Sequence, residues 1–182
     1  MPLLDRHMPP PGEGLDHAPR FARHCEGIST FLVAWHGERP VGSCEIRWGG
    51  CEAPEVTAVH PGCPEVSGLG VWPGTLRRQG VGEGLIEAAE QLAVRRARES
   101  IGVGVTKNNP HAEALYKRLG YRPLTPYLDC WSYEDSRGVA HRVADACLFL
   151  VKGLAGVRGE RGGEPGGAVP SLSGRSRRSA GC

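Results

Sequence analysis

The sequence contains no run that approaches the roughly 20 consecutive apolar residues of a membrane-spanning helix. Residues 1–14 also lack the apolar core and cleavage-site pattern of a signal peptide. The formal net charge is only +2, which is too small on its own to indicate a nucleic-acid partner. We therefore expect a cytoplasmic protein that has neither a membrane nor a nucleic acid as its partner.

Paired cysteine motifs are missing as well. The seven cysteines include no C-x-x-C pair, and none stands at zinc-site spacing from histidines. An odd, scattered set favours reduced thiols and no metal site. Cys51 and Cys63 flank a loop rich in glycine and proline and could lie close in space, but free thiols remain the stronger expectation.

The length of 182 residues fits one domain. Apolar alternation predicts a β-hairpin followed by further strands, and 3.6-residue periodicity predicts helices between them. The expected strands are 31–35, 41–48, 66–72, 101–105, 127–133 and 139–151, and the expected helices are 16–27, 80–98 and 109–120. This order indicates an α/β fold in which helices pack on a mixed sheet.

The two ends of the sequence differ from its middle. Residues 1–29 are expected to be poorly ordered or to form a short helix, with a short first strand at 3–7 as the alternative for that part. Residues 153–182 consist mostly of Gly, Arg and Ser with almost no large apolar side chain. Such a segment cannot bury enough surface to offset its ordering entropy, so a disordered tail is expected.

A glycine turn that opens a helix is the first segment with chemical content. A strand ending in Leu69-Gly70-Val71 leads into the turn Arg77-Arg78-Gln79-Gly80-Val81-Gly82, and the helix follows. The first N–H groups of a helix lack internal partners, and together with the helix dipole they favour an anion such as a pyrophosphate. Gly80 and Gly82 would let the backbone approach that ligand closely.

Two common phosphate-binding patterns do not fit this turn. No G-x-x-x-x-G-K-[ST] string exists, and Leu85 stands where the third glycine of G-x-G-x-x-G would be. The pattern that fits is [RQ]-x-x-G-x-[GA], met by Arg77, Gly80 and Gly82. A second block lies one helix and one strand downstream: Asn109-x-x-Ala112-x-x-Leu115-Tyr116-x-x-Leu119-Gly120-Tyr121.

Together these two blocks resemble the GNAT superfamily of N-acetyltransferases. The resemblance covers residues 30–152 in layout and is strongest over 66–122. It implies a mixed, mostly antiparallel central sheet with flanking helices, and acetyl-CoA as co-substrate. The acceptor would be a small-molecule or peptide amine, and the family also allows a homodimer.

The resemblance also implies residue roles. The backbones of Leu69 and Val71 would pair with the pantetheine amides, and the Asn109 side chain would contact the cofactor near its thioester arm. The Tyr116 hydroxyl would protonate the leaving thiolate. The pyrophosphate would be held by backbone N–H groups, with cationic support from Arg77, within the segment Arg77, Arg78, Gln79, Gly80, Val81 and Gly82.

A base or a chain of water molecules must remove a proton from the amine, because amines are mostly protonated at neutral pH. Glu65 is the first candidate, since some members place a catalytic glutamate six residues before the position of Val71. Glu45 and Asp129 are weaker candidates. Arg78 departs from the family, where glycine is common, and this change is tolerable if its φ is negative.

Two other function classes stay open at this point. The short segment before Phe31 motivates a non-catalytic acyl-CoA-binding or regulatory domain that has lost the acceptor site. The basic run 175–178 motivates a nucleic-acid-associated protein that works through its tail, although a solvated tail is the simpler interpretation.

Overall fold

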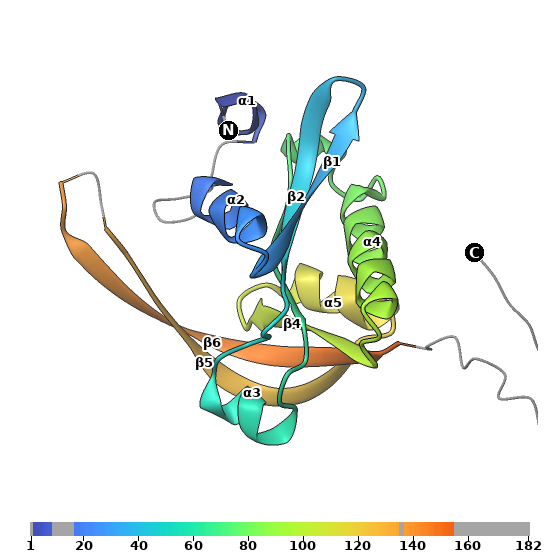
Figure 1. Ribbon diagram of the computed structural model, residues 1–182, viewed down its shortest axis with the longest axis vertical. Coiled ribbons are helices and arrows are strands. Elements are labelled where there is room, and N and C mark those ends of the chain that lie inside the picture. The colour runs from blue at the N-terminus through green and yellow to red at the C-terminus, as the bar shows by residue number, and fades with distance from the viewer. Residues whose placement is uncertain (1, 9–16, 135–136, 155–182) are drawn as a thin grey trace, which may run out of the picture.

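The computed structural model describes residues 2–8, 17–134 and 137–154, which form one twisted sheet with helices on both faces (Figure 1). The strands are β1 (Ser29–His36), β2 (Arg39–Arg47), β3 (Glu65–Val71), β4 (Ser100–Thr106), β5 (Arg122–Glu134) and β6 (Ala140–Gly153). The helices are α1 (Pro2–His7), α2 (His17–Cys25), α3 (Pro54–Val59), α4 (Val81–Arg95) and α5 (Pro110–Arg118), with the 3-10 turn η1 at Gly74–Leu76.

The sheet order is β1-β2-β3-β4-β6-β5. Only β3 and β4 run parallel, and every other neighbouring pair is antiparallel. The predicted mixed, mostly antiparallel sheet with flanking helices is therefore confirmed.

The helix α5 begins and ends where the sequence predicts. The Asn109 side chain accepts a hydrogen bond from the Ala112 N–H at 3.1 Å, which satisfies one of the free donors of the first turn. Pro110 takes the first helical position, where its missing N–H costs nothing. Gly120, just past the end, adopts a φ of +92°.

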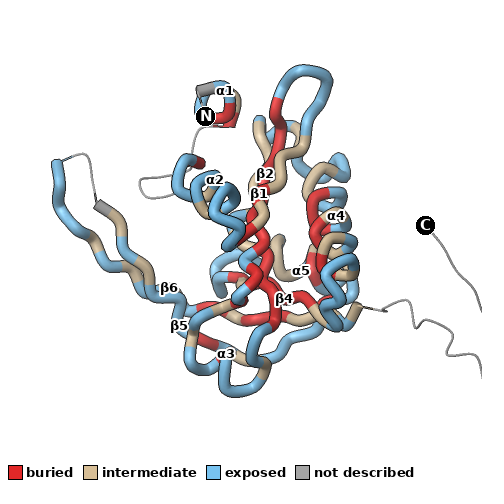
Figure 2. The backbone as a smooth tube through the Cα atoms, in the orientation of Figure 1, coloured by how far each residue is buried: buried red, intermediate tan, exposed pale blue. Residues whose placement is uncertain are grey.

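The main core lies between the sheet and the inner face of α4. Figure 2 shows buried positions running along β2 and β4 and along one side of α4. The helix contributes an apolar stripe at helical spacing, and α5 adds Tyr116. The buried members of this cluster are Cys44, Ile46, Trp48, Val66, Leu85, Ile86, Ala89, Ala93, Ile101, Val103, Val105, Tyr116, Tyr121 and Leu150.

Two short helices replace features that the sequence suggested. Residues 3–7 belong to the helix α1 and form no strand, because Leu4 and Met8 are four positions apart and pack together against Phe31. The glycine- and proline-rich loop that Cys51 and Cys63 flank contains α3, which begins at Pro54 and buries Val56. Residues 9–16 and 155–182 of the expected end segments lie outside the described residues.

The hairpin of β5 and β6 is longer than predicted. It pairs from Arg122 with Val151 to Glu134 with Ala140, and Figure 1 shows it extending as an arm beyond the body of the sheet. Pro123 and Pro126 argue against a strand in the sequence. Proline is accepted here because β5 is an edge strand, where a missing N–H interrupts no second ladder.

The described cysteines carry free thiols, and Cys51 and Cys63 pack in one apolar cluster. Among the helices that the structure describes, none combines the length and the apolar character needed to cross a bilayer.

The feature that positions the site is the early separation of β3 from β4. These strands pair only through Glu65 with Gly102 and Val66 with Val103. Beyond Val66, β3 keeps its pairing with β2 but has no β4 partner. A bulge near Gly68, which has a φ of +59°, accompanies the separation.

Gly102 tests how tightly β4 packs. A Cβ at Gly102 would overlap the Phe149 ring of β6, so we expect Gly102→Ala to lower the free energy of unfolding by about 1–3 kcal/mol. The matched control is Gly153→Ala, because a Cβ there meets open space. Urea unfolding measures both variants, and equal midpoints would contradict this packing.

Candidate functional site

The first turn of α4 carries a cluster of unused backbone donors. Within the described chain, none of the N–H groups of residues 78–83 donates to a protein acceptor, and Gly84 is the first whose N–H bonds back, to Gly80 O at 2.9 Å. Residues 78–80 are exposed, and Val81 and Gly82 are partly exposed. The turn therefore presents accessible donors at the positive end of a 15-residue helix, an arrangement suited to an anion.

The turn is held by its own contacts. The Gln79 side chain donates to Thr75 O at 2.9 Å, and the Arg77 N–H bonds Gly74 O at 3.1 Å. Gly80 has a φ of +87°, which glycine adopts at little cost. Arg78 has a φ of +62°, so the negative φ that would make its replacement of glycine tolerable is not found. The turn imposes a strained conformation on Arg78.

The strand β3 presents a free main-chain edge next to this turn. The Trp72 N–H bonds Val41 O of β2 at 2.8 Å. Because N–H and C=O groups alternate sides along a strand, those of Leu69 and Val71 point away from β2, into the separation from β4. A Cβ at Gly82 would lie 3.8 Å from both side chains, so the α4 turn and this edge adjoin.

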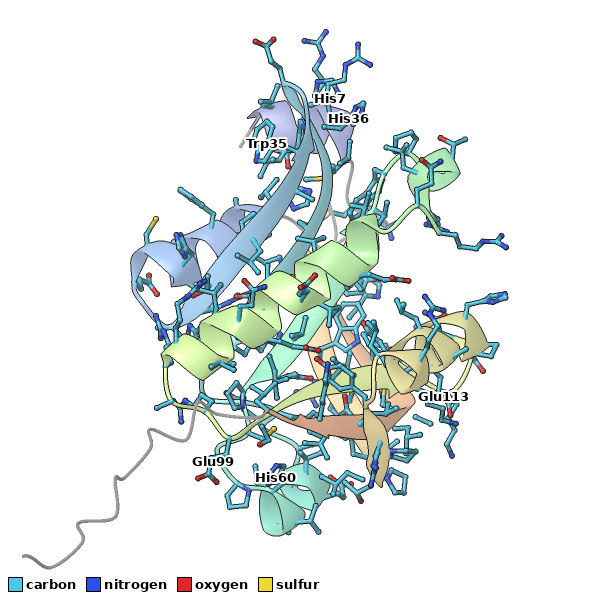
Figure 3. All side chains as sticks on the ribbon, turned by 90° about the vertical axis from the view of Figure 1, so that its right-hand side faces the viewer. His7, Trp35, His36, His60, Glu99 and Glu113 are labelled. Carbon is cyan, nitrogen blue, oxygen red and sulfur yellow. The ribbon has the colours of Figure 1, made fainter. Side chains whose placement is uncertain are left out.

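A cleft of about 1030 Å³ lies along β3, with walls from α2, the α3 region and β5. The cofactor contacts and candidate bases predicted from the sequence that line it are Glu45, Glu65, Leu69, Val71, Arg77 and Asp129. The Arg78 to Gly82 segment adjoins it through Gly82. Asn109, the N-cap of α5, and Tyr116, on α5, are not among the lining residues. His60 lies beside α3 (Figure 3), bonds Ser100 Oγ at 2.9 Å and does not line the cleft either.

Glu65 is the most perturbed carboxyl group in the cleft wall. Its side chain is 7% exposed, and Oε2 receives no hydrogen bond, although Arg47 Nη1 lies 3.8 Å away. Burial raises the pKa of Glu65 to about 7; Arg47 lowers it, and the nearby carboxylates of Asp129, Glu45 and Glu52 raise it further. A carboxyl group that titrates near neutrality can accept a proton at working pH.

Glu45 has a different environment on the neighbouring strand. Although burial opposes ionisation, the paired hydrogen bonds from Arg23, at 2.8 and 2.7 Å, and the nearby Arg20 lower the pKa of Glu45. It is therefore a permanent carboxylate with a structural partner and a poor proton acceptor. Asp129 is exposed on β5 and lines the same cleft as Glu65.

Tyr116 is buried in the main core, where its ring meets Tyr121 edge-on at 5.7 Å. Burial raises the pKa of the Tyr116 hydroxyl well above its usual value, so the hydroxyl stays protonated at neutral pH. It makes no hydrogen bond to a described residue and is free to donate. The described residues include no group of three or more His, Cys, Asp or Glu side chains arranged for a metal ion.

The arginines of α2 are the site residues that sequence reasoning missed. Arg20 donates to the main-chain carbonyls of Ser67 at 3.4 Å and Gly68 at 3.1 Å, which braces the bulge of β3. Arg23 pairs with Glu45. The available signal was their spacing of three in a predicted helix, which puts both on one face, together with an acidic residue in an otherwise buried strand.

Comparison with known proteins identifies the fold and the family. The model of the acetyltransferase (GNAT) family matches residues 2–121. No curated relative matches the sequence.

Several solved structures share the fold. The ribosomal-protein-S18-alanine N-acetyltransferase of Escherichia coli is 16% identical, with a TM-score of 0.56 and 87% of each chain covered. A ribosomal-protein-alanine N-acetyltransferase from Brucella melitensis is 21% identical, with a TM-score of 0.52 and 76% of each chain covered. A Bacillus subtilis acetyltransferase in complex with CoA is 17% identical, with a TM-score of 0.53, over 84% of this chain and 90% of that one.

The strained turn makes a stability prediction. Arg78→Gly should raise the free energy of unfolding by about 0.5–1 kcal/mol, because relief of the left-handed conformation, about 1–2 kcal/mol, exceeds the entropy that glycine adds to the unfolded chain. Arg77→Gly is the matched control. Its φ is −65°, so only the entropy loss applies and stability should fall. Thermal unfolding compares the two, and shifts in the same direction would contradict the strain at Arg78.

Proposed function

Because the chain belongs to the acetyltransferase (GNAT) family, we propose that it transfers an acetyl group from acetyl-CoA to a primary amine by direct attack. The observation that carries this proposal is the row of free N–H donors at residues 78–83, next to the open main-chain edge of β3. The open edge of β3 suits an amide-bearing arm such as pantetheine, and the free N–H donors of residues 78–83 suit a diphosphate. This donor pattern fits acetyl-CoA.

The chain's own residues would share the binding. The N–H groups from Arg78 to Gly82 would hold the pyrophosphate, with the exposed cation of Arg77 beside it. The main-chain groups of Leu69 and Val71 would extend the sheet onto the pantetheine. Asn109 caps α5 with its Oδ1, and contact of the same side chain with the thioester arm is a further prediction.

Bound acetyl-CoA supplies an activated acetyl thioester. Glu65 would take the proton from the acceptor ammonium, and the neutral nitrogen would bond to the acetyl carbon as the carbon–sulfur bond breaks. The electron pair leaves with sulfur, and the Tyr116 hydroxyl would protonate the thiolate. The second proton, released by the new amide nitrogen, would pass through solvent and restore the Tyr116 hydroxyl. Glu65 is preferred to Glu45 because only Glu65 titrates near neutral pH.

The non-catalytic alternative rested on a missing acceptor wall. Residues of α2, among them His17 and Arg20, line the same cleft as Glu65, which supports a wall for the acceptor and favours catalysis over the non-catalytic alternative. The basic run of the nucleic-acid alternative lies outside the described residues. A homodimer and a cytoplasmic location stay predictions.

Cofactor binding is tested by filling the space between α4 and β3. Wild-type protein should bind acetyl-CoA with micromolar affinity in calorimetry, and Gly82→Trp should abolish binding, because its side chain projects toward Leu69 and Val71. Gly84→Trp is the control. Its side chain would enter open space, and its N–H is already bonded to Gly80. Equal affinity in the wild type and Gly82→Trp would contradict this position of the pyrophosphate.

The base is tested by pH dependence. Glu65 is protonated below its pKa of about 7 and cannot accept a proton there, so kcat/KM should fall as the pH drops through 7. Glu65→Gln should remove this limb, lower kcat/KM at pH 8 by roughly 10²–10⁴-fold and leave acetyl-CoA affinity intact. Without the base, only amine that is already neutral in solution can react, so kcat/KM of the variant should instead rise with the deprotonation of the amine itself. An unchanged limb near pH 7 in the variant would exclude Glu65 as the base.

A further inference from the structure

The arginines that line the cleft differ in how fully their donors are already used by other groups of the protein. Arg20 and Arg23 of α2 are occupied by Glu45 and by the carbonyls of the β3 bulge. Arg77 lies at the end next to the α4 turn, and Arg47 is 3.8 Å from Glu65 at the rim. The two arginines of α2 therefore have few donors left for an acceptor molecule.

The buried polar atoms that lack partners at the cleft are hydrogen-bond acceptors. Of the described residues that line it, only Glu65 and His17 have a buried side-chain atom without a hydrogen bond. Met8 O can only accept, so His17 Nε2 donates to it at 2.7 Å, and in the neutral ring Nδ1 is then an acceptor. Such atoms call for a ligand that brings donors.

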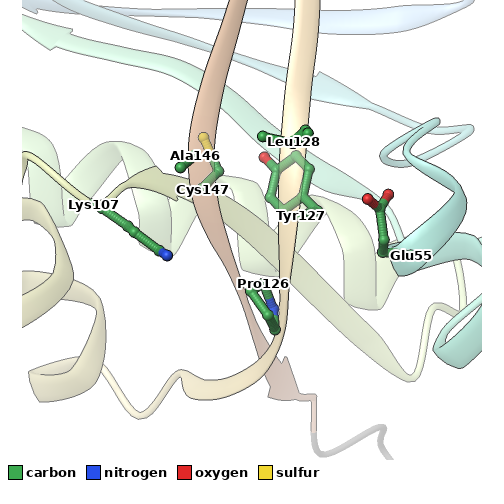
Figure 4. A pocket seen from close by; sticks show the side chains of 7 residues that line it. All are labelled: Glu55, Lys107, Pro126, Tyr127, Leu128, Ala146 and Cys147. Atoms are coloured by element: carbon green, nitrogen blue, oxygen red, sulfur yellow. The ribbon is translucent and has the colours of Figure 1, made fainter.

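The opposite wall adds carboxylates that have no cation. Glu52 and Asp129 line the cleft, and no ion pair involves either of them within the described chain. Asp129 lies directly across from Asp145 in the β5–β6 ladder, where like charges are unfavourable unless a cation offsets them. Glu55 also lines the cleft but is not counted with these carboxylates, because it borders a second, small hollow that Lys107 lines as well (Figure 4).

An aromatic ring stands beside this acidic wall. Trp131 lines the cleft two positions after Asp129, and its Nε1 donates to Asp145 at 3.3 Å. The indole N–H is thereby used, while the ring stays partly exposed. An aromatic face next to carboxylates is a favourable setting for an ammonium group.

We propose that the acceptor is a small amine that carries a second ammonium group, with the reacting nitrogen at Glu65 and the second ammonium held by Asp129 and Glu52 beside Trp131. This assignment rests on the proposed acetyl transfer and adds the substrate class. The carboxylates form no cluster suited to one metal ion among the described residues, and two ammonium groups on one molecule would supply a cation both to Glu65 and to the Asp129–Glu52 wall.

The test compares acceptors of equal length by release of the CoA thiol. We expect kcat/KM for 1,4-diaminobutane to exceed that for butylamine about tenfold, well beyond the factor of two from its two equivalent amines. The compound 4-aminobutanoate, which replaces the second ammonium with a carboxylate, should react no faster than butylamine. Equal rates for all three, a preference for the carboxylate, or turnover of a basic peptide without turnover of the diamine would overturn the assignment.

A matched pair of variants locates the second ammonium. Asp129→Asn should bring the diamine-to-butylamine ratio down toward two, mainly through KM for the diamine. Glu38→Gln removes the same charge in the exposed turn of the β1–β2 hairpin and should keep the ratio. Acetyl-CoA affinity measured on both variants verifies that each is folded. A ratio that survives in Asp129→Asn would overturn the role of this wall.

Calorimetry with the CoA-saturated protein separates this assignment from the proposed reaction. Selective, Asp129-dependent binding of 1,4-diaminobutane without turnover would support the substrate class and contradict the transferase. Turnover of amines without selectivity for the diamine would support the transferase and contradict the substrate class. Neither turnover nor selective binding would overturn both.

Discussion

The arrangement of the site depends on the limited pairing between β3 and β4. Two residue pairs hold the parallel strands together, and the remaining main chain of β3 is bonded on one side only. If β3 and β4 paired along their whole length, the main-chain amides of Leu69 and Val71 would bond to β4 and no free edge would remain for a ligand. The same separation lets the first turn of α4 sit against β3 with its donors free. Extended-chain recognition and anion recognition therefore have a common structural origin.

Glu65 and Glu45 illustrate how neighbouring strands give one residue type two chemistries. Both side chains are almost fully buried, so burial alone pushes both pKa values upward. Two arginines from α2 reverse the effect at Glu45, whereas Glu65 has one arginine at 3.8 Å that makes no hydrogen bond to Oε2, and several carboxylates around it. The protein thus keeps one carboxylate as a structural anchor and the other near neutrality. The difference is made by α2, a helix that precedes the sheet.

Local signals were sufficient for much of this fold. The cap at Asn109, Pro110 and Gly120 fixed α5, and apolar periodicity fixed α4, because each signal acts within a few residues. The glycine turn was identifiable for the same reason. The bulge at Gly68 and the Arg23–Glu45 pair could not be predicted, since they depend on how a strand meets its neighbour or on contacts between segments more than twenty residues apart. The φ of Arg78 was missed for a different reason, because an arginine normally favours a negative φ and the residue type gives no sign of a left-handed turn. The helix α1 was missed because one pair of apolar residues four apart is too short a pattern to distinguish from loop.

The bulge of β3 has a consequence for the two faces of the strand. Between its pairing with Glu45 and with Ser43, β3 advances three residues while β2 advances two. The extra residue changes the parity of the strand, so Glu65 looks toward α2 while Leu69 and Val71 look toward α4. Removing Gly68 would restore strict alternation and send those two side chains to the acceptor side, with Trp72 turned into the α4 interface. The one extra residue in β3 thus determines which of the two proposed substrates, the amine or acetyl-CoA, each half of the strand faces.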